Sequence, residues 1–496
     1  MSIRCIIGLL ALLISTVASY AAPTTTPSSD NRPNILLAIA DDWSSPHASI
    51  LGDPVVKTPT FDRVAREGVL FTRSFCAAPT CSASRASILT GQAPHRLESG
   101  ADLWSYLPAK FPVYTNMLER AGYYVGFERK GWGPGQLGDR KRNPAGRHFN
   151  NFEEFLASVP PGKPFCYWFG SHDPHRPYRL GQGAESGMDP AKVIVPPYLP
   201  DTRETRGDIL DYYFAVERYD RDTGHILDLL QKAGKLDNTI VVMTGDNGWP
   251  FPRAKANAYE VSSHVPLAVR WPARANGGRR VDELVSLTDL APTFLEAGGL
   301  KPTRAMTGQS ILPLIVAQSE AGAKPRAAIF VERERHANVR QGDLGYPIRA
   351  IRTDRYLLIR NFRPDLWPAG DPVMWKAVGP FGDIDPGPTK ETLLSRQLDP
   401  GFSDLFRLAC AKRPAEELYD LQKDPYAMRN VADTTEYRDA QHDLRKQLDD
   451  WMTKTADPRA KLGGNYDAFD HYPYYGGAAT NWKAPAKEAQ TKPSAR

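Results

Sequence analysis

Three features are scarce in this sequence of 496 residues, and each scarcity excludes a class of protein. Five cysteines are too few for a disulfide-based fold in a chain of this length. Apart from Ile6–Val17 there is no long apolar run, and this one is shorter than the ~20 residues that a membrane-spanning helix needs. The formal net charge is only +5 and no basic stripe is present, so nucleic acid is not an expected partner, whereas an acidic substrate would suit this charge.

The N-terminal segment is typical of an export signal. Arg4 precedes the apolar run Ile6–Val17, and small residues precede a candidate cleavage point after Ala21. We therefore expect residues 1–21 to be a cleaved signal peptide and residues 22–31, rich in Pro, Thr and Ser, to be a linker. The mature protein should be secreted or periplasmic and should contain no membrane span. Its four cysteines allow at most two disulfides: Cys76, Cys81, Cys166 and Cys410.

Residues 32–325 alternate between apolar strands and amphipathic helices. This alternation predicts an α/β domain with a mostly parallel sheet between layers of helices. The expected strands are 35–40, 69–75, 123–127, 165–170 and 240–243, and the expected helices start at Pro59, span 113–121 and run from Ile209 to Leu230. Three of these strands are followed by polar clusters, and the carboxyl ends of parallel strands are where such sheets build ligand sites.

The pattern changes after about residue 325. Short strands are expected at 329–331, 348–351, 356–360 and 417–421, followed by a helix at 439–452. Residues 326–477 are thus predicted to form a smaller domain, an antiparallel sheet carrying one helix. Residues 478–496, rich in Ala, Lys and Pro, are expected to be disordered.

A candidate nucleophile lies in the segment Cys81-Ser82-Ala83-Ser84-Arg85, which continues to Thr90-Gly91. A helix that begins at Cys81 would offer free N–H groups to an anion, with Arg85 as a fixed cation in its first turn. The segment resembles the signature of the formylglycine-dependent sulfatases of the alkaline phosphatase superfamily. The resemblance implies that Cys81 is oxidised to formylglycine, whose hydrated aldehyde is the nucleophile. Ala83 departs from that signature, where Pro is commoner, and the alternative is a structural or disulfide-bonded Cys81.

Two acidic segments indicate a metal site. Asp41 and Asp42 follow the first strand directly, and Asp246 and Asn247 follow another. Such hard oxygen donors favour calcium or magnesium over zinc. The resemblance implies a divalent cation, usually calcium and less often magnesium, held by these four residues and by the modified Cys81. The alternative is that these residues are helix caps and turn residues.

A histidine segment and two lysines complete the candidate site. His172-Asp173-Pro174-His175 follows a buried strand, and histidine can donate a proton near neutral pH. The resemblance assigns proton donation to His172 and implies catalytic or sulfate-binding roles for Lys130 and Lys255. His175 is a candidate for substrate binding or for a structural role, and a zinc site built on both histidines lacks a third ligand.

The resemblance extends over most of the mature chain. Segments 172–177 and 246–259 are most similar to N-sulfoglucosamine sulfohydrolases. The resemblance implies a sulfated glycan as substrate. It also implies a maturing enzyme as partner, either formylglycine-generating or of the anaerobic sulfatase-maturing type. Trp132 stands where the family commonly has a His that helps to expel sulfate. Two alternatives stay open, a phosphoesterase or phosphonate hydrolase of the same superfamily and a non-catalytic glycan-binding protein.

Overall fold

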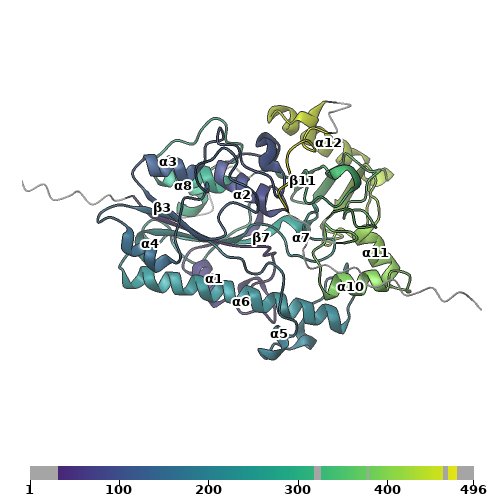
Figure 1. Cartoon of the computed structure of the whole chain (residues 1–496), viewed down its shortest axis with the longest axis horizontal. Helices are drawn as coiled ribbons and strands as arrows, with labels where there is room; N and C mark the ends of the chain where they lie inside the picture. Colours follow the sequence, from purple (N-terminus) through teal and green to yellow (C-terminus); the bar gives the residue numbers. More distant parts are fainter. Residues whose placement is uncertain (1–31, 318–325, 377–378, 462–466, 477–496) are drawn as a thin grey trace, which may run out of the picture.

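The computed structural model describes residues 32–317, 326–376, 379–461 and 467–476. The expected signal peptide, linker and C-terminal tail lie outside these described residues. The described part folds into two sheets with their helices, a larger N-terminal unit and a smaller C-terminal one (Figure 1). A search of the described helices for one long and apolar enough to cross a membrane finds none.

The larger sheet has nine strands. In spatial order they are β4 (Arg147–His148), β3 (Tyr124–Arg129), β5 (Phe165–Gly170), β1 (Asn34–Ala40), β6 (Thr239–Gly245), β7 (His264–Arg270), β2 (Val69–Phe75) and β8 (Arg279–Val281), with β9 (Val285–Ser286) also paired to β2. From β4 to β6 all neighbours are parallel, and β7 is antiparallel to both of its neighbours. The prediction of a mostly parallel sheet is therefore confirmed.

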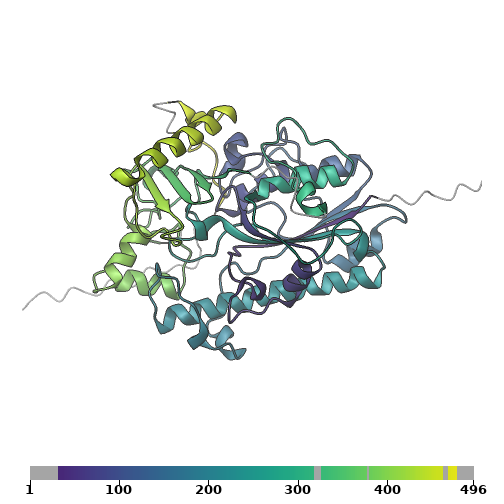
Figure 2. The ribbon, with the colours of Figure 1, turned by 180° about the vertical axis from the view of Figure 1, so that it is seen from behind.

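Helices cover both faces of this sheet (Figures 1 and 2). One face carries α2 (Cys81–Thr90), α3 (Tyr114–Arg120) and α8 (Leu290–Ala297); the other carries α1 (Pro59–Arg66), α4 (Phe152–Ser158) and the long α6 (Arg203–Lys232). In β1, Ile35 and Leu37 belong to the first core whereas Leu36 and Ala38 belong to the second. Burial on both faces explains why the parallel strands read as continuous apolar runs. The short helices α5 (Gln182–Glu185), α7 (Glu260–Ser263) and α9 (Leu312–Val316) lie in connecting segments.

The smaller sheet is antiparallel throughout, as expected from the sequence. Its strands are β10 (Ala328–Arg333), β11 (Ile348–Thr353), β12 (Tyr356–Asn361) and β13 (Glu416–Asp420), with α10 (Pro388–Ser395) and α11 (Phe402–Cys410) between the last two. The helix α12 (Arg438–Lys454) packs Leu444 and Leu448 onto one face. The other face packs against Ala258 and Tyr259 of the larger unit, in the loop that follows β6. The smaller unit thus supports a loop of the candidate site.

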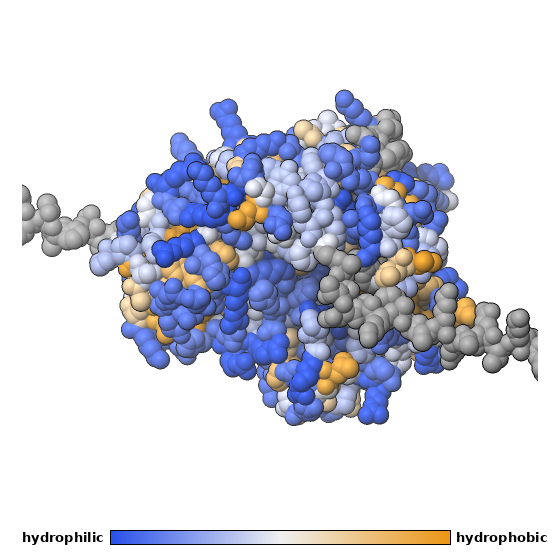
Figure 3. Space-filling view, in the orientation of Figure 1, coloured by the Kyte–Doolittle hydropathy of each residue, from blue (hydrophilic) through white to orange (hydrophobic). Residues whose placement is uncertain are grey.

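Apolar side chains are mostly inside the molecule. The face in Figure 3 is largely hydrophilic, with apolar residues in small separate groups. The four described cysteines are all buried, free thiols, so they form no disulfide with one another: Cys76, Cys81, Cys166 and Cys410. Cys81 is therefore available for another role.

Candidate active site

Four neighbouring parallel strands end at one edge of the sheet, and each is followed by residues of the predicted site. Lys130 follows β3, His172 and His175 follow β5, Asp41 and Asp42 follow β1, and Asp246 and Asn247 follow β6. Parallel strands gather their carboxyl ends in this way, so segments far apart in the sequence meet at one place. Cys81 reaches the same place as the first residue of α2.

The loops at this edge cross closely. A Cβ on Gly170 would lie 1.6 Å from the carbonyl oxygen of Lys130, and a Cβ on Gly245 would lie 2.3 Å from that of Trp43. Only glycine fits at these two strand ends. Asp42 has a φ of 71°, in the left-handed region, and its N–H donates to Oδ1 of Asp246 over 3.0 Å. The tight turn therefore holds the two acidic segments against each other.

Cys81 lies beside the carboxylates. Its Sγ is 3.3 Å from Oδ1 of Asp41 and 3.8 Å from Oδ1 of Asp42, and Nδ2 of Asn247 is also 3.8 Å away. The side chain is only 2% exposed. Burial, together with the charge of Asp41, raises the pKa of the Cys81 thiol well above its usual value. The sulfur is thus held as a neutral thiol at the centre of a charged cluster.

Each of three buried carboxylates is paired with one cation. Nε of Arg85 donates to Asp246 over 2.7 Å, Nζ of Lys130 to Asp41 over 2.5 Å, and Nζ of Lys255 to Asp42 over 2.7 Å. All three cations were predicted as site residues.

The two adjacent aspartates respond differently to this arrangement. Burial favours the neutral form of Asp41, but the charges of Lys130, His175, Arg85 and Lys255 together outweigh it and hold the pKa of Asp41 well below its usual value. Burial raises the pKa of Asp42 to about 6, because Lys255 offsets it only in part. Asp41 and Asp246 add to this rise. Asp42 is therefore the carboxylate of this cluster whose charged form is least stabilised by the residues around it.

These residues fit a hard divalent cation. Ligand atoms of Asp41, Asp42, Cys81 and Asp246 all lie within 4.8 Å of one another. Oδ1 of Asn247 is buried and has no hydrogen-bond partner among the described residues. A buried amide oxygen of this kind is costly unless it meets a cation or a donor. Three carboxylates and an amide oxygen are the donor set of calcium or magnesium.

The two predicted histidines lie differently. Nδ1 of His175 is 2.5 Å from the carbonyl oxygen of Arg176, so Nδ1 carries a hydrogen and Nε2 is the ring nitrogen left without this bond. This Nε2 is 3.8 Å from Oδ2 of Asp42 and faces the cluster. His172 is exposed, and its pKa is lowered by partial burial and by the charge of Lys130. Among the described residues, no group of candidate metal ligands includes His172.

Trp132 has a structural place beside the nucleophile helix. Its indole is buried, and Nε1 donates to the carbonyl oxygen of Ser82 over 3.2 Å. Nη1 of Arg85 donates to the carbonyl oxygens of Lys130 and Gly131, over 2.9 and 3.1 Å. Trp132 therefore helps to fix the first turn of α2. Its indole cannot act as a base in place of the histidine that the family commonly has at this position.

Two residues of the smaller unit reach the site and were missed from the sequence. Oδ2 of Asp385 accepts from Nζ of Lys255 over 3.1 Å, and its carboxylate belongs to a group with Asp42 and His175. Nδ1 of His336 lies 2.7 Å from Oγ1 of Thr80, the residue before Cys81. Burial lowers the pKa of His336 to about 3, so this ring is neutral. Asp385 follows no strand, and His336, although three residues after β10, belongs to no motif recognised in the sequence.

Family models match this chain in two places. The model described as "Sulfatase" matches residues 33–300, which is more than half of the chain. The model described as "N-sulphoglucosamine sulphohydrolase, C-terminal" matches residues 245–371. The second match includes Asp246, Asn247 and Lys255 and continues into the smaller sheet.

Individual proteins are similar over most of the chain. N-sulphoglucosamine sulphohydrolase of Homo sapiens is 29% identical over 481 residues, covering 86% of this chain and 91% of that protein. An ulvan-active sulfatase of Formosa agariphila is 28% identical, covering 86% of this chain and 76% of that protein.

Two solved structures show the same fold at lower identity. One is a protein in complex with its substrate D-glucosamine-2-N,6-O-disulfate, with a TM-score of 0.62, 19% identity, and coverage of 86% of this chain and 98% of that one. The other is the phosphonate monoester hydrolase of Agrobacterium radiobacter, with a TM-score of 0.64, 19% identity, and coverage of 86% and 96%. The predicted alkaline-phosphatase-like architecture is thus confirmed.

Proposed function

The chain belongs to the sulfatase family, and on this premise we propose that it is an exported enzyme that removes the N-linked sulfate from glucosamine residues of a sulfated glycan. The observation that carries the proposal is the gathering of Cys81, three carboxylates and three cations at one edge of the sheet. The similarity of residues 245–371 to the C-terminal model of N-sulphoglucosamine sulphohydrolase supports the N-sulfate specificity.

Position 81 would provide the nucleophile after oxidation of Cys81 to formylglycine. The hydrated aldehyde supplies one hydroxyl to attack sulfur and a second whose loss of a proton lets sulfate leave. Because Cys81 is buried, a maturing enzyme, formylglycine-generating or of the anaerobic sulfatase-maturing type, would have to act before this part of the chain folds.

A divalent cation in the acidic cluster would give the site the positive charge that an anionic substrate needs. Asp41, Asp42, Asp246 and Asn247, with the modified Cys81, would hold calcium, or less favourably magnesium, which would polarise a sulfate oxygen. Arg85, Lys130 and Lys255 are held by buried carboxylates at fixed positions around Cys81. Such preorganised cations stabilise the charge that builds up on the sulfate oxygens in the transition state.

We assign proton donation to His175, although the sequence pattern favoured His172. The departing nitrogen needs a proton, and Nε2 of His175 faces the cluster while Nδ1 is held by the carbonyl oxygen of Arg176. His172 is exposed, and its pKa is lowered, so it holds its proton less readily. A role for His172 at the outer part of the substrate fits its exposure.

Asp385 gives a physical reason for a sulfamate substrate. When the N–S bond breaks and the nitrogen is protonated, the product carries an ammonium group, whereas an O-sulfate leaves a neutral hydroxyl. The Asp385 carboxylate is 21% exposed at the rim of the site and belongs to the same group as His175. A carboxylate there would stabilise the ammonium but would give a hydroxyl much less.

The phosphonate hydrolase alternative shares the fold with this chain. A dianionic phosphate monoester would meet Asp385 as well as the three metal-binding carboxylates, and like charges at this range are unfavourable. A singly charged sulfate therefore suits the cluster better than a phosphate monoester does. A phosphonate monoester carries one charge, as a sulfate ester does, so charge does not separate these two substrates.

The two histidines can be separated by substitution. We expect His175→Ala to lower kcat/KM for an N-sulfated glucosamine roughly 10²–10⁴-fold, the usual size of general acid catalysis. His172→Ala, the matched control in the same loop, should change kcat/KM less than about tenfold and act mainly on KM. Steady-state kinetics of both variants distinguish the two assignments. A large loss of kcat in His172→Ala, with the kcat of His175→Ala unchanged, would assign proton donation to His172 instead.

The substrate is tested by measuring free sulfate released from N-sulfoglucosamine and from 6-O-sulfated N-acetylglucosamine. We expect release from the first and little from the second. Asp385→Asn, which keeps the shape of the side chain, should reduce the preference for the N-sulfate about tenfold. Clear release from the O-sulfate alone would reject the N-sulfate specificity while leaving the sulfatase activity in place.

A further inference from the structure

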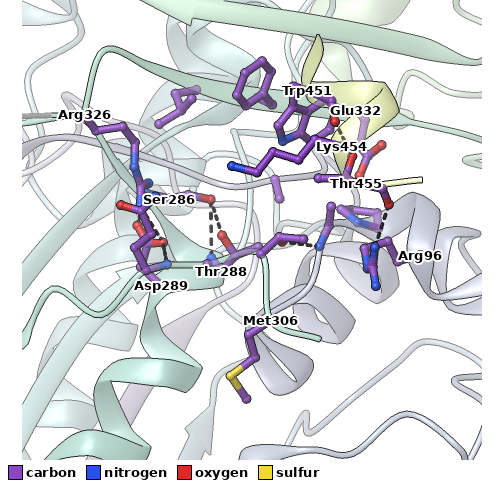
Figure 4. A pocket seen from close by; sticks show the side chains of 18 of the residues that line it. Arg96, Ser286, Thr288, Asp289, Met306, Arg326, Glu332, Trp451, Lys454 and Thr455 are labelled. Carbon is purple, nitrogen blue, oxygen red and sulfur yellow. Dashed lines mark hydrogen bonds and ion pairs between the residues drawn. The ribbon is translucent and has the colours of Figure 1, made fainter. Parts of the chain in front are cut away.

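A second cavity lies between the two units, away from the carboxylate cluster. Its volume is about 500 Å³, within the range of roughly 300–1,000 Å³ typical of small-molecule sites. Its wall combines the segment after α2, the loop 304–309 and residues of β10 and α12 (Figure 4). Cys81 is at the other end of α2, and ten helical residues span about 15 Å. The cavity is therefore a separate place from the candidate active site.

The two acidic side chains in the wall already have partners within the protein. Asp289 accepts two hydrogen bonds from Arg326, of 2.7 and 2.9 Å. Glu332 contacts Nδ1 of His95 at 2.7 Å and Nε of Arg349 at 3.1 Å. Both carboxylates are therefore engaged by residues other than Arg96, Arg304 and Lys454 of the wall.

Three cations in the wall have no acidic partner among the described residues. Arg96 donates to the carbonyl oxygen of Thr455 over 2.6 Å and to the side-chain oxygen of Gln92 over 3.3 Å, both neutral acceptors. Arg304 and Lys454 are exposed, and the structure gives neither an ion pair. In Figure 4 the side chain of Lys454 extends into the cavity between Trp451 and Thr288. The cavity is thus positively charged.

The remaining wall suits a sugar. Trp451 is held in place by stacking on Phe330, with ring centroids 4.3 Å apart and an interplanar angle of 5°. Hydroxyl groups of Ser286 and Thr288 line the opposite side in Figure 4. A fixed aromatic surface, hydroxyl groups and unpaired cations together match the apolar ring face, the hydroxyls and the acid groups of an anionic saccharide.

We propose that this cavity binds a sulfated or carboxylated sugar unit as a second, non-catalytic glycan site. The inference rests on the proposed function for the kind of glycan, but the cavity and its charge are independent of Cys81. Such a site would hold a glycan chain on the protein and raise its local concentration near the active site.

The test is a binding titration of the full chain in a Cys81→Ala background, which prevents turnover. A sulfated disaccharide and inorganic sulfate are used as two separate probes. Isothermal titration calorimetry measures the binding of each. The pocket variant carries Arg304→Ala and Lys454→Ala, and Arg96 is left in place because it bonds the backbone. The control variant carries Lys57→Ala and Lys163→Ala, two exposed lysines outside the cavity with the same loss of charge.

We expect two classes of site in the parent and in the control, and one of them weakened at least about tenfold in the pocket variant. Inorganic sulfate should bind the second site more weakly than the disaccharide. Identical isotherms for the pocket variant and the control would overturn the proposal, as would inorganic sulfate binding as tightly as the disaccharide. Failure of the proposed function would appear elsewhere, as absence of sulfate release by the unsubstituted protein.

Discussion

Cys81→Ala is expected to reduce kcat by roughly 10⁴-fold or more while the protein remains folded. The substitution removes the atom from which the nucleophile is made, and neither the metal ligands nor the cations can replace it. It removes little volume, so the Tm should change by about 2–4 °C or less. The measurement combines sulfate release from N-sulfoglucosamine with thermal unfolding of the same sample.

The matched control is Cys410→Ala, which removes another buried free thiol at the end of α11. Its activity should stay within about twofold of that of the unsubstituted protein, because Cys410 lies outside the site. Cys81→Ser should be inactive if the maturing enzyme accepts only cysteine. Near-normal turnover by Cys81→Ala would reject the mechanism, whatever the behaviour of the serine variant.

Asn247→Ala is expected to raise the Kd for calcium roughly 10- to 100-fold or more, and to lower activity accordingly at limiting calcium. Its Oδ1 is the buried oxygen without a hydrogen-bond partner among the described residues, so its removal takes away a ligand without leaving a charge unpaired. Exhaustive chelation of the unsubstituted protein should have the same effect. Excess calcium should restore part of the activity of the variant.

A second readout is independent of activity. A ligand that binds only the folded state raises its stability, so calcium should increase the Tm of the unsubstituted protein and do so much less for Asn247→Ala. The control is Asn34→Ala, at the opposite end of β1, where Asn34 accepts from the N–H of Phe165 over 3.1 Å. It should lower stability but keep the calcium response. Full activity after chelation, with no metal detected, would remove the cation from the mechanism.

Much of the larger unit could be predicted because local pattern and burial agree. The strand at 165–170 was predicted with its observed limits, since Phe165–Gly170 is buried on both faces and therefore apolar throughout. The acidic pairs were recognised because they stand directly at strand ends. The parallel order of β3, β5, β1 and β6 then brings them together, a result that follows from the topology and not from any one segment.

Other features depend on contacts that a linear pattern does not contain. The sequence of β7 does not indicate that this strand runs antiparallel to β2 and β6, because an apolar strand has the same composition in either direction. The orientation of His175 is decided by the bond of Nδ1 to the carbonyl oxygen of Arg176, so spacing alone could not separate the two histidines. Asp385 and His336 reach the site only because the smaller sheet packs against the loop that carries Lys255.

The central claim, that Cys81 is converted into the nucleophile, is tested most directly by mass spectrometry. Cleavage after Arg73 and Arg85 gives a peptide that contains both Cys76 and Cys81, so the second thiol serves as an internal control. The active protein should contain this peptide about 18 Da lighter than the dithiol form, from conversion of one thiol to an aldehyde, with the loss assigned to position 81 by fragmentation. Finding only the unmodified dithiol peptide in a fully active sample would contradict the account.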